Sequence, residues 1–373
     1  MWHCRWPVFV VAVLVTMPIT ARAQPLVLAH CANWQNSCQF QGASVMPLLH
    51  KPNDPCPGYT ARTPYAIAAI NQLLTDANII ALVSWWARHG EPQAFAGDDF
   101  FNMYLSVQSP VRIGILYEMT ARLYAGTDGM YDFNDPANRE RVLDDMEYLT
   151  ETYFRKYPDR FFTIDGRVPV YFWATPAVRG PFAAVLDEVR LRFPIYVITS
   201  PFSLNGVPSS GGEVMDMIRS SDAVTAYGTY DRDETIATGG VMTDEYIAKI
   251  STAWLAWSRT LHLKVNAPNT KLILPFSFAF NNMLAHPDSI NPPLTTTPTQ
   301  ACREMTSLRA VLNSTNGTNI IGVNVVSLTE VYEGTAVMPS EQYGPTLYNF
   351  IKSITTVPLG APLTCPTGWH DEK

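Results

Sequence analysis

The sequence predicts a single (β/α)₈ barrel, the TIM-barrel form of the α/β fold class. Short apolar runs alternate with longer amphipathic segments, and eight such pairs follow one another along the chain. The short runs are almost continuously apolar, which is typical of parallel strands buried on both faces. The 373-residue length, without an internal repeat or low-complexity linker, suits one large barrel.

The predicted strands are runs rich in Val, Ile, Leu and aromatic residues, which favour buried strands. In chain order they are Leu26–His30, Ile79–Trp86, Val111–Glu118, Val168–Ala174, Ile195–Ser200, Ala223–Tyr227, Lys271–Ala279 and Ile320–Leu328. Pro275 falls inside the seventh run, where it is unfavourable because proline lacks a backbone N–H donor.

The predicted helices begin at capping residues and carry apolar residues at helical spacing. In chain order they are Thr63–Asp76, Asp98–Val107, Asp135–Lys156, Gly180–Phe193, Gly212–Ser220, Thr243–Leu263, Thr299–Leu312 and Tyr343–Ile354. Thr63 followed by Pro64 is a typical N-cap and first helical position. Thr243 caps a helix that has acidic residues in its first turn, which favours the helix dipole.

Residues 1–23 are predicted to be a secretory signal peptide, which leaves 24–373 as the catalytic domain. Arg5 provides a basic start, Pro7–Pro18 is an apolar core, and Ala21-Arg22-Ala23 is a small-residue cleavage site. We therefore expect a secreted or periplasmic protein without a membrane span. The formal charge of −7 becomes more negative when the leader is removed, which argues against nucleic acid as a partner. The oligomeric state stays open, with a monomer as the expected form.

Five cysteines follow the predicted leader, so at least one of them has no intramolecular partner. Cys31 and Cys38 are close enough in sequence to form a disulfide, and Cys302 and Cys365 are the second candidate pair. Cys56 completes the set. The cysteines show no metal-ligand spacing, and the chain contains neither a Walker A loop nor an H-E-x-x-H motif. We therefore expect no metal and no organic cofactor.

A (β/α)₈ enzyme builds its active site at the C-terminal ends of its strands. The residues at or just beyond those ends combine carboxylates, aromatic rings, amides and an imidazole, which suit the binding of sugars. The candidates for substrate binding are His30, Asn33, Trp34, Trp85, Trp86, Tyr117, Glu118, Trp173, Tyr230, Asn281 and Asn282. Glu330 and Glu333 follow the eighth strand, and paired carboxylates perform acid/base chemistry at glycosidic bonds.

Each candidate also has a purely structural interpretation. Glu118 can pair with an arginine such as Arg112 or Arg122, and His30 can be a hydrogen-bonded core histidine. Adjacent residues of a strand point to opposite faces, so only one of Trp85 and Trp86 can face the site. For the same reason, two strand residues three positions apart point to opposite faces. The chain must therefore turn between the two glutamates if both are to face one sugar, and Gly334 permits such a turn.

Four stretches carry a resemblance to a known family: Val83–Trp86 (VSWW), Ile164–Val170 (IDGRVPV), Asp222–Tyr227 (DAVTAY) and Ser327–Thr335 (SLTEVYEGT). They resemble the I-S-W-W, I-D-G-R-P-V, D-G-x-Y-x-Y and S-F-N-E-W-H-E-G-T motifs of glycoside hydrolase family 99, the endo-α-mannosidases and endo-α-mannanases, and its family 99-like relatives. The resemblance spans most of the chain after the predicted leader.

The resemblance implies a retaining glycoside hydrolase that acts on α-linked glycans, with α-mannan as the candidate substrate. By position, Glu333 corresponds to the family's general acid/base, and Glu330 to the residue that deprotonates the 2-hydroxyl of the sugar. Tyr227 corresponds to a tyrosine that assists catalysis. Glu118 matches the glutamate of the family's H-x-E-P-Y motif.

The chain departs from the family at positions around these residues. His30–Trp34 stand where the family has a Y-Y-P-W-Y segment, and Ser277–Asn282 replace a P-G-F-D-D type loop. Thr329 and Val331 stand where the final motif has Asn and Trp. The chain therefore resembles a divergent member that keeps the acids and changes the sugar contacts.

Two other functions remain open at this point. One is an inverting glycosidase of the α-glucanase type on the same barrel, which also uses two acids. The other is a non-catalytic polysaccharide-binding or assembly protein. The anomer of the product distinguishes the first from a retaining enzyme, and glycan binding without any product would identify the second.

Overall fold

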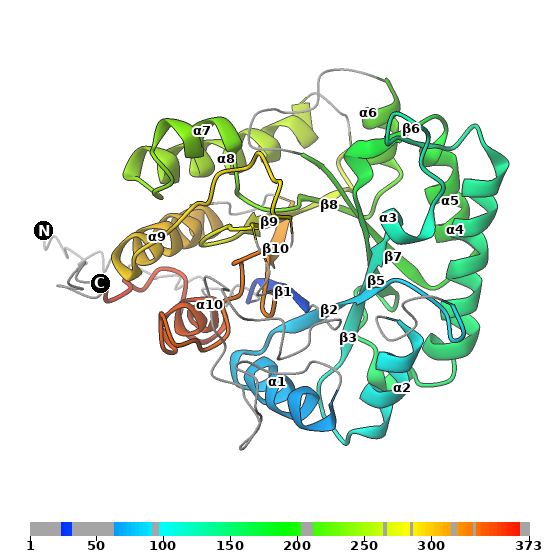
Figure 1. Ribbon diagram of the computed structural model, residues 1–373, viewed down its shortest axis with the longest axis horizontal. Coiled ribbons are helices and arrows are strands. Elements are labelled where there is room, and N and C mark those ends of the chain that lie inside the picture. Colours follow the sequence, from blue (N-terminus) through cyan, green and yellow to red (C-terminus); the bar gives the residue numbers. More distant parts are fainter. Residues whose placement is uncertain are drawn as a thin grey trace, which may run out of the picture.

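The computed structural model describes residues 24–31, 63–91, 97–202, 212–263, 267–283, 286–314, 319–330 and 333–365. Eight parallel strands close into a barrel in the order β1-β10-β9-β8-β7-β5-β3-β2, and helices surround it (Figure 1). The first and last strands pair directly, with Val27 opposite Val323. The prediction of a (β/α)₈ barrel is confirmed.

All of the predicted strands are present, with shifts of one to three residues at their ends. They are β1 Leu26–Cys31, β2 Ile80–Trp85, β3 Ile113–Glu118, β5 Val168–Trp173, β7 Ile195–Phe202, β8 Ala223–Ala226, β9 Lys271–Phe276 and β10 Ile320–Val325. The largest shifts are in β9 and β10, which end three residues before the predicted Ala279 and Leu328. Leu328 N–H still bonds the carbonyl of His30 at 2.8 Å, so the chain stays against β1 after the strand ends.

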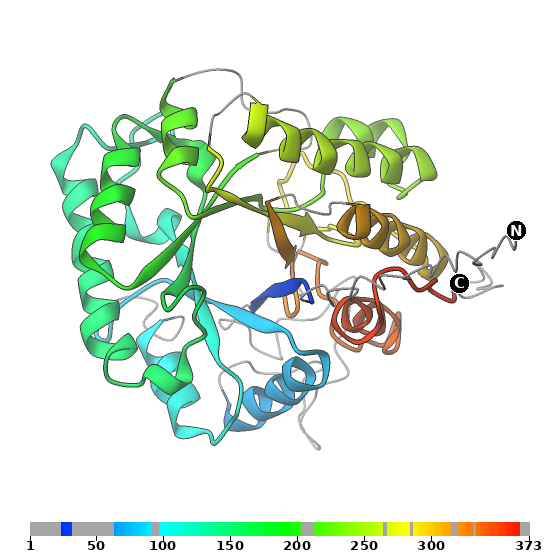
Figure 2. The same ribbon diagram turned by 180° about the vertical axis from the view of Figure 1, so that it is seen from behind.

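The predicted helices form the outer ring, which is also visible from behind (Figure 2). They are α1 Pro64–Ala77, α2 Asp98–Ser106, α4 Pro136–Leu149, α5 Phe182–Arg192, α6 Gly212–Arg219, α8 Asp244–Leu263, α9 Pro298–Ser314 and α10 Thr346–Thr356. Thr63 caps α1 as predicted, because its side chain accepts a hydrogen bond from Ala66 N–H at 3.1 Å. The helix predicted to reach Lys156 is regular only to Leu149 and continues as a π-helical turn, Thr150–Phe154.

Short elements that the sequence did not predict lie in the connections between strands and helices. They are α3 Met119–Arg122, α7 Arg232–Ala237, the paired strands β4 Tyr131–Asp132 and β6 Val178–Arg179, and the single turns Pro158–Arg160 and Thr175–Ala177. Each has fewer than seven residues. Segments this short have too few residues to establish a hydrophobic period.

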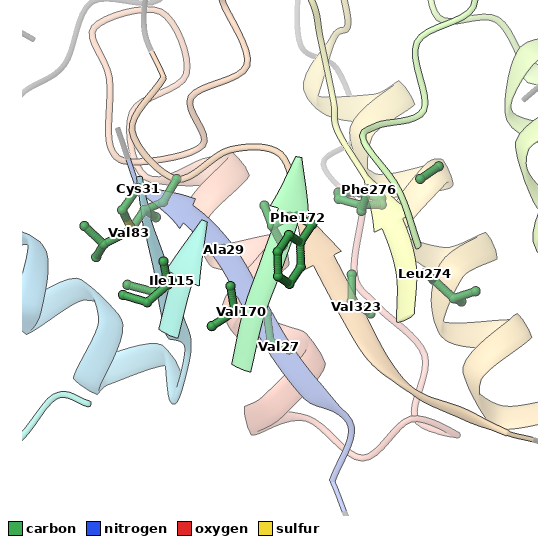
Figure 3. Packing of buried hydrophobic residues seen from close by; sticks show 14 of the residues in the cluster. Val27, Ala29, Cys31, Val83, Ile115, Val170, Phe172, Leu274, Phe276 and Val323 are labelled. Carbon is green, nitrogen blue, oxygen red and sulfur yellow. The ribbon is translucent and has the colours of Figure 1, made fainter. Parts of the chain in front are cut away.

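The core has two parts, because alternate side chains of each strand point outward or inward. The outward residues pack against the helices, as Val27, Ala29 and Cys31 of β1 do (Figure 3). The inward residues fill the barrel with a smaller cluster that includes Leu28, Leu82, Leu116, Tyr171, Tyr196, Ile198, Ala223 and Ile273. The barrel is therefore closed below its C-terminal rim by packed side chains.

Pro275 is accommodated near the C-terminal end of β9, beyond Lys271 and Leu272, the residues that pair with β8. It lies opposite Asn324 of β10, and its carbonyl accepts a hydrogen bond from Trp254 Nε1 of α8 at 3.1 Å. Proline cannot donate to the ladder, but here its oxygen anchors a fully buried tryptophan. The residue therefore fixes a helix to the barrel wall.

The predicted disulfide between Cys302 and Cys365 is present and ties α9 to the C-terminal segment. The candidate bridge from Cys31 to Cys38 is excluded, because Cys31 is a free thiol. It ends β1 on the outward face and is covered by the core cluster between the barrel and the helices. Burial raises the pKa of this thiol to about 12. Cys38, Cys56 and the predicted leader lie outside the described residues.

In the part of the chain that the structure describes, no helix combines the length and apolar character needed to cross a bilayer. In the same part, no three His, Cys, Asp or Glu side chains gather as a metal site.

Candidate active site

The segment that carries Glu330 and Glu333 turns back on itself beyond β10. Ser327 N–H bonds the carbonyl of Thr335 at 3.2 Å, and Thr335 N–H bonds the carbonyl of Glu330 at 3.2 Å. The Ser327 hydroxyl accepts a hydrogen bond from Glu330 N–H at 2.7 Å. Gly334 has φ 62°, the left-handed conformation that glycine adopts without strain. The expected turn is therefore present, with Gly334 in it.

Glu333 is held at both its carboxylate and its backbone. The Tyr227 hydroxyl, which follows β8, donates to Glu333 Oε2 at 2.9 Å. Asn281 N–H, which follows β9, donates to the carbonyl of Glu333 at 2.6 Å. Burial raises the pKa of Glu333, while the Tyr227 hydrogen bond and the nearby His286 oppose that shift. The carboxyl group consequently keeps its proton to a higher pH than an exposed glutamate does.

Glu118 ends β3 on the inward face and is 8% exposed. Burial raises its pKa to about 8, the charge of Glu333 adds to the shift, and a hydrogen bond with Ser84 opposes it. The alternative pairing with Arg122 is not found, since that guanidinium bonds Asp145 and Glu91 instead. Glu118 is therefore a carboxyl group kept neutral near pH 7 beside a second acid.

His30 precedes Cys31, the last residue of β1, and lies in the same inward layer. Its ring lies 5.1 Å from that of Tyr171 and 5.7 Å from that of Tyr227, between ring centroids. Burial lowers its pKa to about 3, with partial opposition from Asn324, so the imidazole is neutral at ordinary pH. Among the described residues, His30 Nε2 has no hydrogen-bond partner. It is the kind of buried polar atom that a ligand hydroxyl or a water satisfies.

Asn324 is a site residue that the sequence reasoning missed. It is the last residue but one of β10, opposite Leu28 and Pro275, and it is 1% exposed. A signal was present, because Asn324 is the single polar residue within the apolar run Ile320–Val326. Buried amides usually have a polar partner, but among the described residues neither Nδ2 nor Oδ1 of Asn324 has a hydrogen-bond partner. The amide is nevertheless near enough to His30 to oppose the lowering of the pKa of that imidazole.

Three further aromatic and amide candidates lie on one side of the rim. Trp173 at the end of β5 packs edge-on against Tyr227, with 5.5 Å between ring centroids. Tyr230 donates its hydroxyl to the carbonyl of Pro292 at 2.8 Å. Asn282 is buried beside the Glu333 segment, and its Oδ1 has no partner among the described residues. All of these lie on the side of β5, β8 and β9.

Trp85 and Tyr117 do not face the site, so their prediction as substrate-binding residues is wrong. Both are 0% exposed on the outward face of the barrel. Trp85 Nε1 bonds Asp98 of α2 at 3.2 Å, and the Tyr117 hydroxyl bonds Asp145 of α4 at 2.9 Å. The reason is strand alternation, which turns their neighbours Ser84 and Glu118 inward and these rings toward the helices.

Trp86 lies just beyond β2 and is half-buried. Its role in substrate binding stays a prediction. Asn33 and Trp34 lie outside the described residues. The predicted site residues that lie at or just beyond the C-terminal ends of the strands are His30, Trp86, Glu118, Trp173, Tyr227, Tyr230, Asn281, Asn282, Glu330 and Glu333.

The raised pKa of Glu118 predicts how the free energy of unfolding depends on pH. Between its ordinary value of 4.5 and its folded value of about 8, the native state binds more protons than the unfolded state. The contribution of this group to the free energy of unfolding is therefore complete below pH 4.5 and is lost as the pH rises through 8. Glu118→Gln cannot ionise, so we expect wild type to lose stability relative to this variant between pH 5 and 9.

The measurement is denaturant unfolding of both proteins across that pH range. The expected difference grows by up to about 1.4 kcal/mol for each pH unit in that window. Glu341→Gln, which removes an exposed glutamate, is the control, and its free energy of unfolding should depend on pH as that of wild type does. Parallel pH curves for wild type and Glu118→Gln would contradict the raised pKa.

No family model and no curated protein matches the sequence. Solved structures do resemble the fold. A glycoside hydrolase-like protein has a TM-score of 0.64 at 15% identity, covering 90% of this chain and 95% of its own. The family 99 endo-α-mannosidase of Bacteroides thetaiotaomicron has a TM-score of 0.59 at 11% identity in its complex with bis-tris propane. A second structure of that enzyme scores 0.54 at 12% identity.

Both endo-α-mannosidase structures are matched over 88% of this chain and 95% of theirs. The likeness therefore extends over nearly the whole barrel and its connections, although few residues are identical. At such identities it establishes the fold alone, a (β/α)₈ barrel.

Proposed function

We propose that this protein is a retaining glycoside hydrolase that cleaves α-linked glycans, with α-mannan as the leading candidate substrate. The observation that carries the proposal is the bond from Tyr227 to Glu333 at 2.9 Å, on an acid whose pKa is raised. Glu330 belongs to the same turn, and Glu118 lies close enough to Glu333 for the charge of Glu333 to raise its pKa. The fold likeness to an endo-α-mannosidase supports the choice of substrate.

In the first step, Glu333 donates its proton to the glycosidic oxygen as the bond from that oxygen to the anomeric carbon breaks. Glu330 removes the proton of the 2-hydroxyl of the same sugar, and the 2-oxygen attacks the anomeric carbon. The products are the leaving sugar and a 1,2-anhydro sugar. Burial supports the role of Glu333 because it favours the protonated form that a general acid needs.

In the second step, water attacks the anomeric carbon and opens the anhydro ring. The Glu333 carboxylate takes a proton from the water, and Glu330 returns its proton to the 2-oxygen. Two inversions at one carbon give net retention. Tyr227 orients Glu333 in both steps through its hydrogen bond. Every step is a proton transfer or a displacement at carbon, so the mechanism uses no metal and no organic cofactor.

The substrate is bound by the neutral polar groups and aromatic rings around the acids. His30 accepts a hydrogen bond from a sugar hydroxyl at Nε2, and Glu118 donates one while it is protonated. Trp173 offers a half-exposed ring for stacking. The remaining contacts are assigned to Trp86, Asn281, Asn282 and Tyr230, together with Asn33 and Trp34.

A screen of α-linked mannans and glucans tests the activity, and NMR of the first-formed product tests the stereochemistry. We expect reducing ends to appear and the product to keep the α configuration. A β product would support the inverting alternative, because inversion needs a water on the opposite face of the sugar. Binding without any product would exclude hydrolysis.

We also propose that residues 1–23 are removed on export and that the enzyme acts outside the cytoplasm. The disulfide between Cys302 and Cys365 supports this location, because disulfides persist in oxidising compartments. N-terminal sequencing of the exported protein tests the cleavage point after Ala23.

A further inference from the structure

Two aromatic side chains pack together on neighbouring rim segments, and other residues of the same segments contact Glu333. Tyr230 follows β8 and Phe280 follows β9, strands that are adjacent in the barrel (Figure 1). Their ring centroids are 4.3 Å apart, with the planes inclined by 41°. Both side chains are half-buried, so each ring leaves part of its surface open.

The pair is held in place by the segment that follows it along the chain. Phe280 N–H donates to the carbonyl of Leu294 at 3.0 Å, and Leu294 N–H donates to the carbonyl of Phe280 at 2.7 Å. The Tyr230 hydroxyl donates to the carbonyl of Pro292 at 2.8 Å. Both rings are therefore anchored to the same short stretch and form a preorganised surface.

Both rings are also tied to Glu333 through their chain neighbours. Asn281 follows Phe280 and donates its N–H to the carbonyl of Glu333 at 2.6 Å. Tyr227 lies three residues before Tyr230 and binds the Glu333 carboxylate at 2.9 Å. Because consecutive Cα atoms are about 3.8 Å apart, the pair lies within the reach of a glycan whose cleaved bond is at Glu333.

Core packing alone does not account for the exposure of Phe280. Phe276 and Phe278 belong to the same segment and are 0% and 1% exposed, as residues that serve only the core are. Phe280 touches the edge of the core cluster but remains half-buried. An aromatic ring that is half-buried on a rim segment is a typical surface for stacking.

We propose that Phe280 and Tyr230 form an aromatic platform for a second sugar, next to the one whose bond is cleaved. The inference rests on the proposed function, because Glu333 marks the cleavage point. The ligand is an uncharged pyranose unit, whose C–H face packs on the rings while its hydroxyls stay in water. The site consequently takes glycans of at least two linked sugars and binds them more tightly than a single sugar.

The test uses a Glu333→Gln parent, so that binding is measured without turnover. Calorimetric titration with α-linked mannooligosaccharides and glucooligosaccharides of one to four units gives the affinity of each. Phe280→Ala in this parent is expected to weaken tetrasaccharide binding about 3- to 10-fold, the range of an aromatic stacking contact. Monosaccharide binding is expected to weaken less, and Phe280→Trp is expected to restore the tetrasaccharide affinity.

Phe280→Leu keeps apolar volume without a ring, and it should behave as Phe280→Ala does if the ring is what binds. Met283→Ala removes an exposed side chain from the same segment and serves as the matched control. Unchanged tetrasaccharide affinity in the Phe280 variants, or equal losses for one and four sugars, would overturn the platform. A parent that binds none of the sugars would overturn it as well.

These outcomes are separable from those of the proposed function. If wild type hydrolyses no glycan while the Phe280 variants lose tetrasaccharide affinity, the hydrolase proposal fails and the platform stands. If wild type hydrolyses a glycan and the Phe280 variants bind as the parent does, the platform alone fails.

Discussion

Glu333→Gln is expected to lower kcat on the α-linked substrate by about 10²- to 10⁴-fold, the range of general acid/base catalysis. Glutamine keeps the size of the side chain and can still accept the Tyr227 hydrogen bond at its amide oxygen. It has no proton to donate to the leaving oxygen and cannot take one from water. The free energy of unfolding and the glycan affinity should therefore change little while turnover collapses.

Glu341→Gln is the matched control for this experiment. It makes the same chemical change at an exposed glutamate eight residues further along the chain. The measurement is initial-rate kinetics with wild type and both variants, together with thermal unfolding to show that each is folded. Equal kcat for wild type and Glu333→Gln would remove Glu333 from the mechanism.

Asp145→Ala is expected to destabilise the fold by about 3–5 kcal/mol, the cost of breaking a buried ion pair by removing one partner. Asp145 of α4 is 0% exposed and accepts bonds from Arg122 at 2.6 and 2.8 Å, from Arg88 at 2.7 Å and from Tyr117 at 2.9 Å. The change leaves the buried Arg122 without its main counter-ion. Tyr117 loses its hydrogen bond to Asp145 and precedes Glu118, so we also expect Glu118 to be held less rigidly.

Asp144→Ala provides a sharp contrast, because the neighbouring carboxylate also pairs with Arg88, at 3.0 Å. Its side chain is 65% exposed, and pairs of that kind contribute about 0–1 kcal/mol. Denaturant unfolding of both variants at pH 7 makes the comparison. Similar losses for the two aspartates would show that burial does not control the strength of this network.

Much of the barrel could be predicted because its signals are local. A continuous apolar run as short as Ile195–Ser200 is typical of a buried strand, and Thr63-Pro64 fixes the start of a helix within one residue. The positions at which strands and helices end depend on tertiary contacts as well as on local sequence. The chain leaves the β10 ladder at Val325 although Val326 and Leu328 are equally apolar, because other contacts bury those residues.

The candidate site was predicted in part for the same reason. Two glutamates followed by glycine after the last strand are a local signal, and the structure turns the chain at that point. Tyr117 was assigned to the site because it ends a strand beside Glu118. Adjacent strand residues cannot both face inward, and the buried acid takes the inward position. A polar residue inside the apolar run Ile320–Val326 marks Asn324 as unusual, but the sequence does not show which residues lie beside it.

The sequence by itself therefore determined the barrel, the order of its strands along the chain and the rim on which the acids lie. These properties follow from hydrophobic period and capping, which involve residues close together in the chain. Only the tertiary structure decided that Tyr227 binds Glu333, that burial shifts the pKa values of Glu118 and His30, and that Cys31 is free. Those properties depend on desolvation and on distances between strands far apart in the sequence, which no local pattern encodes.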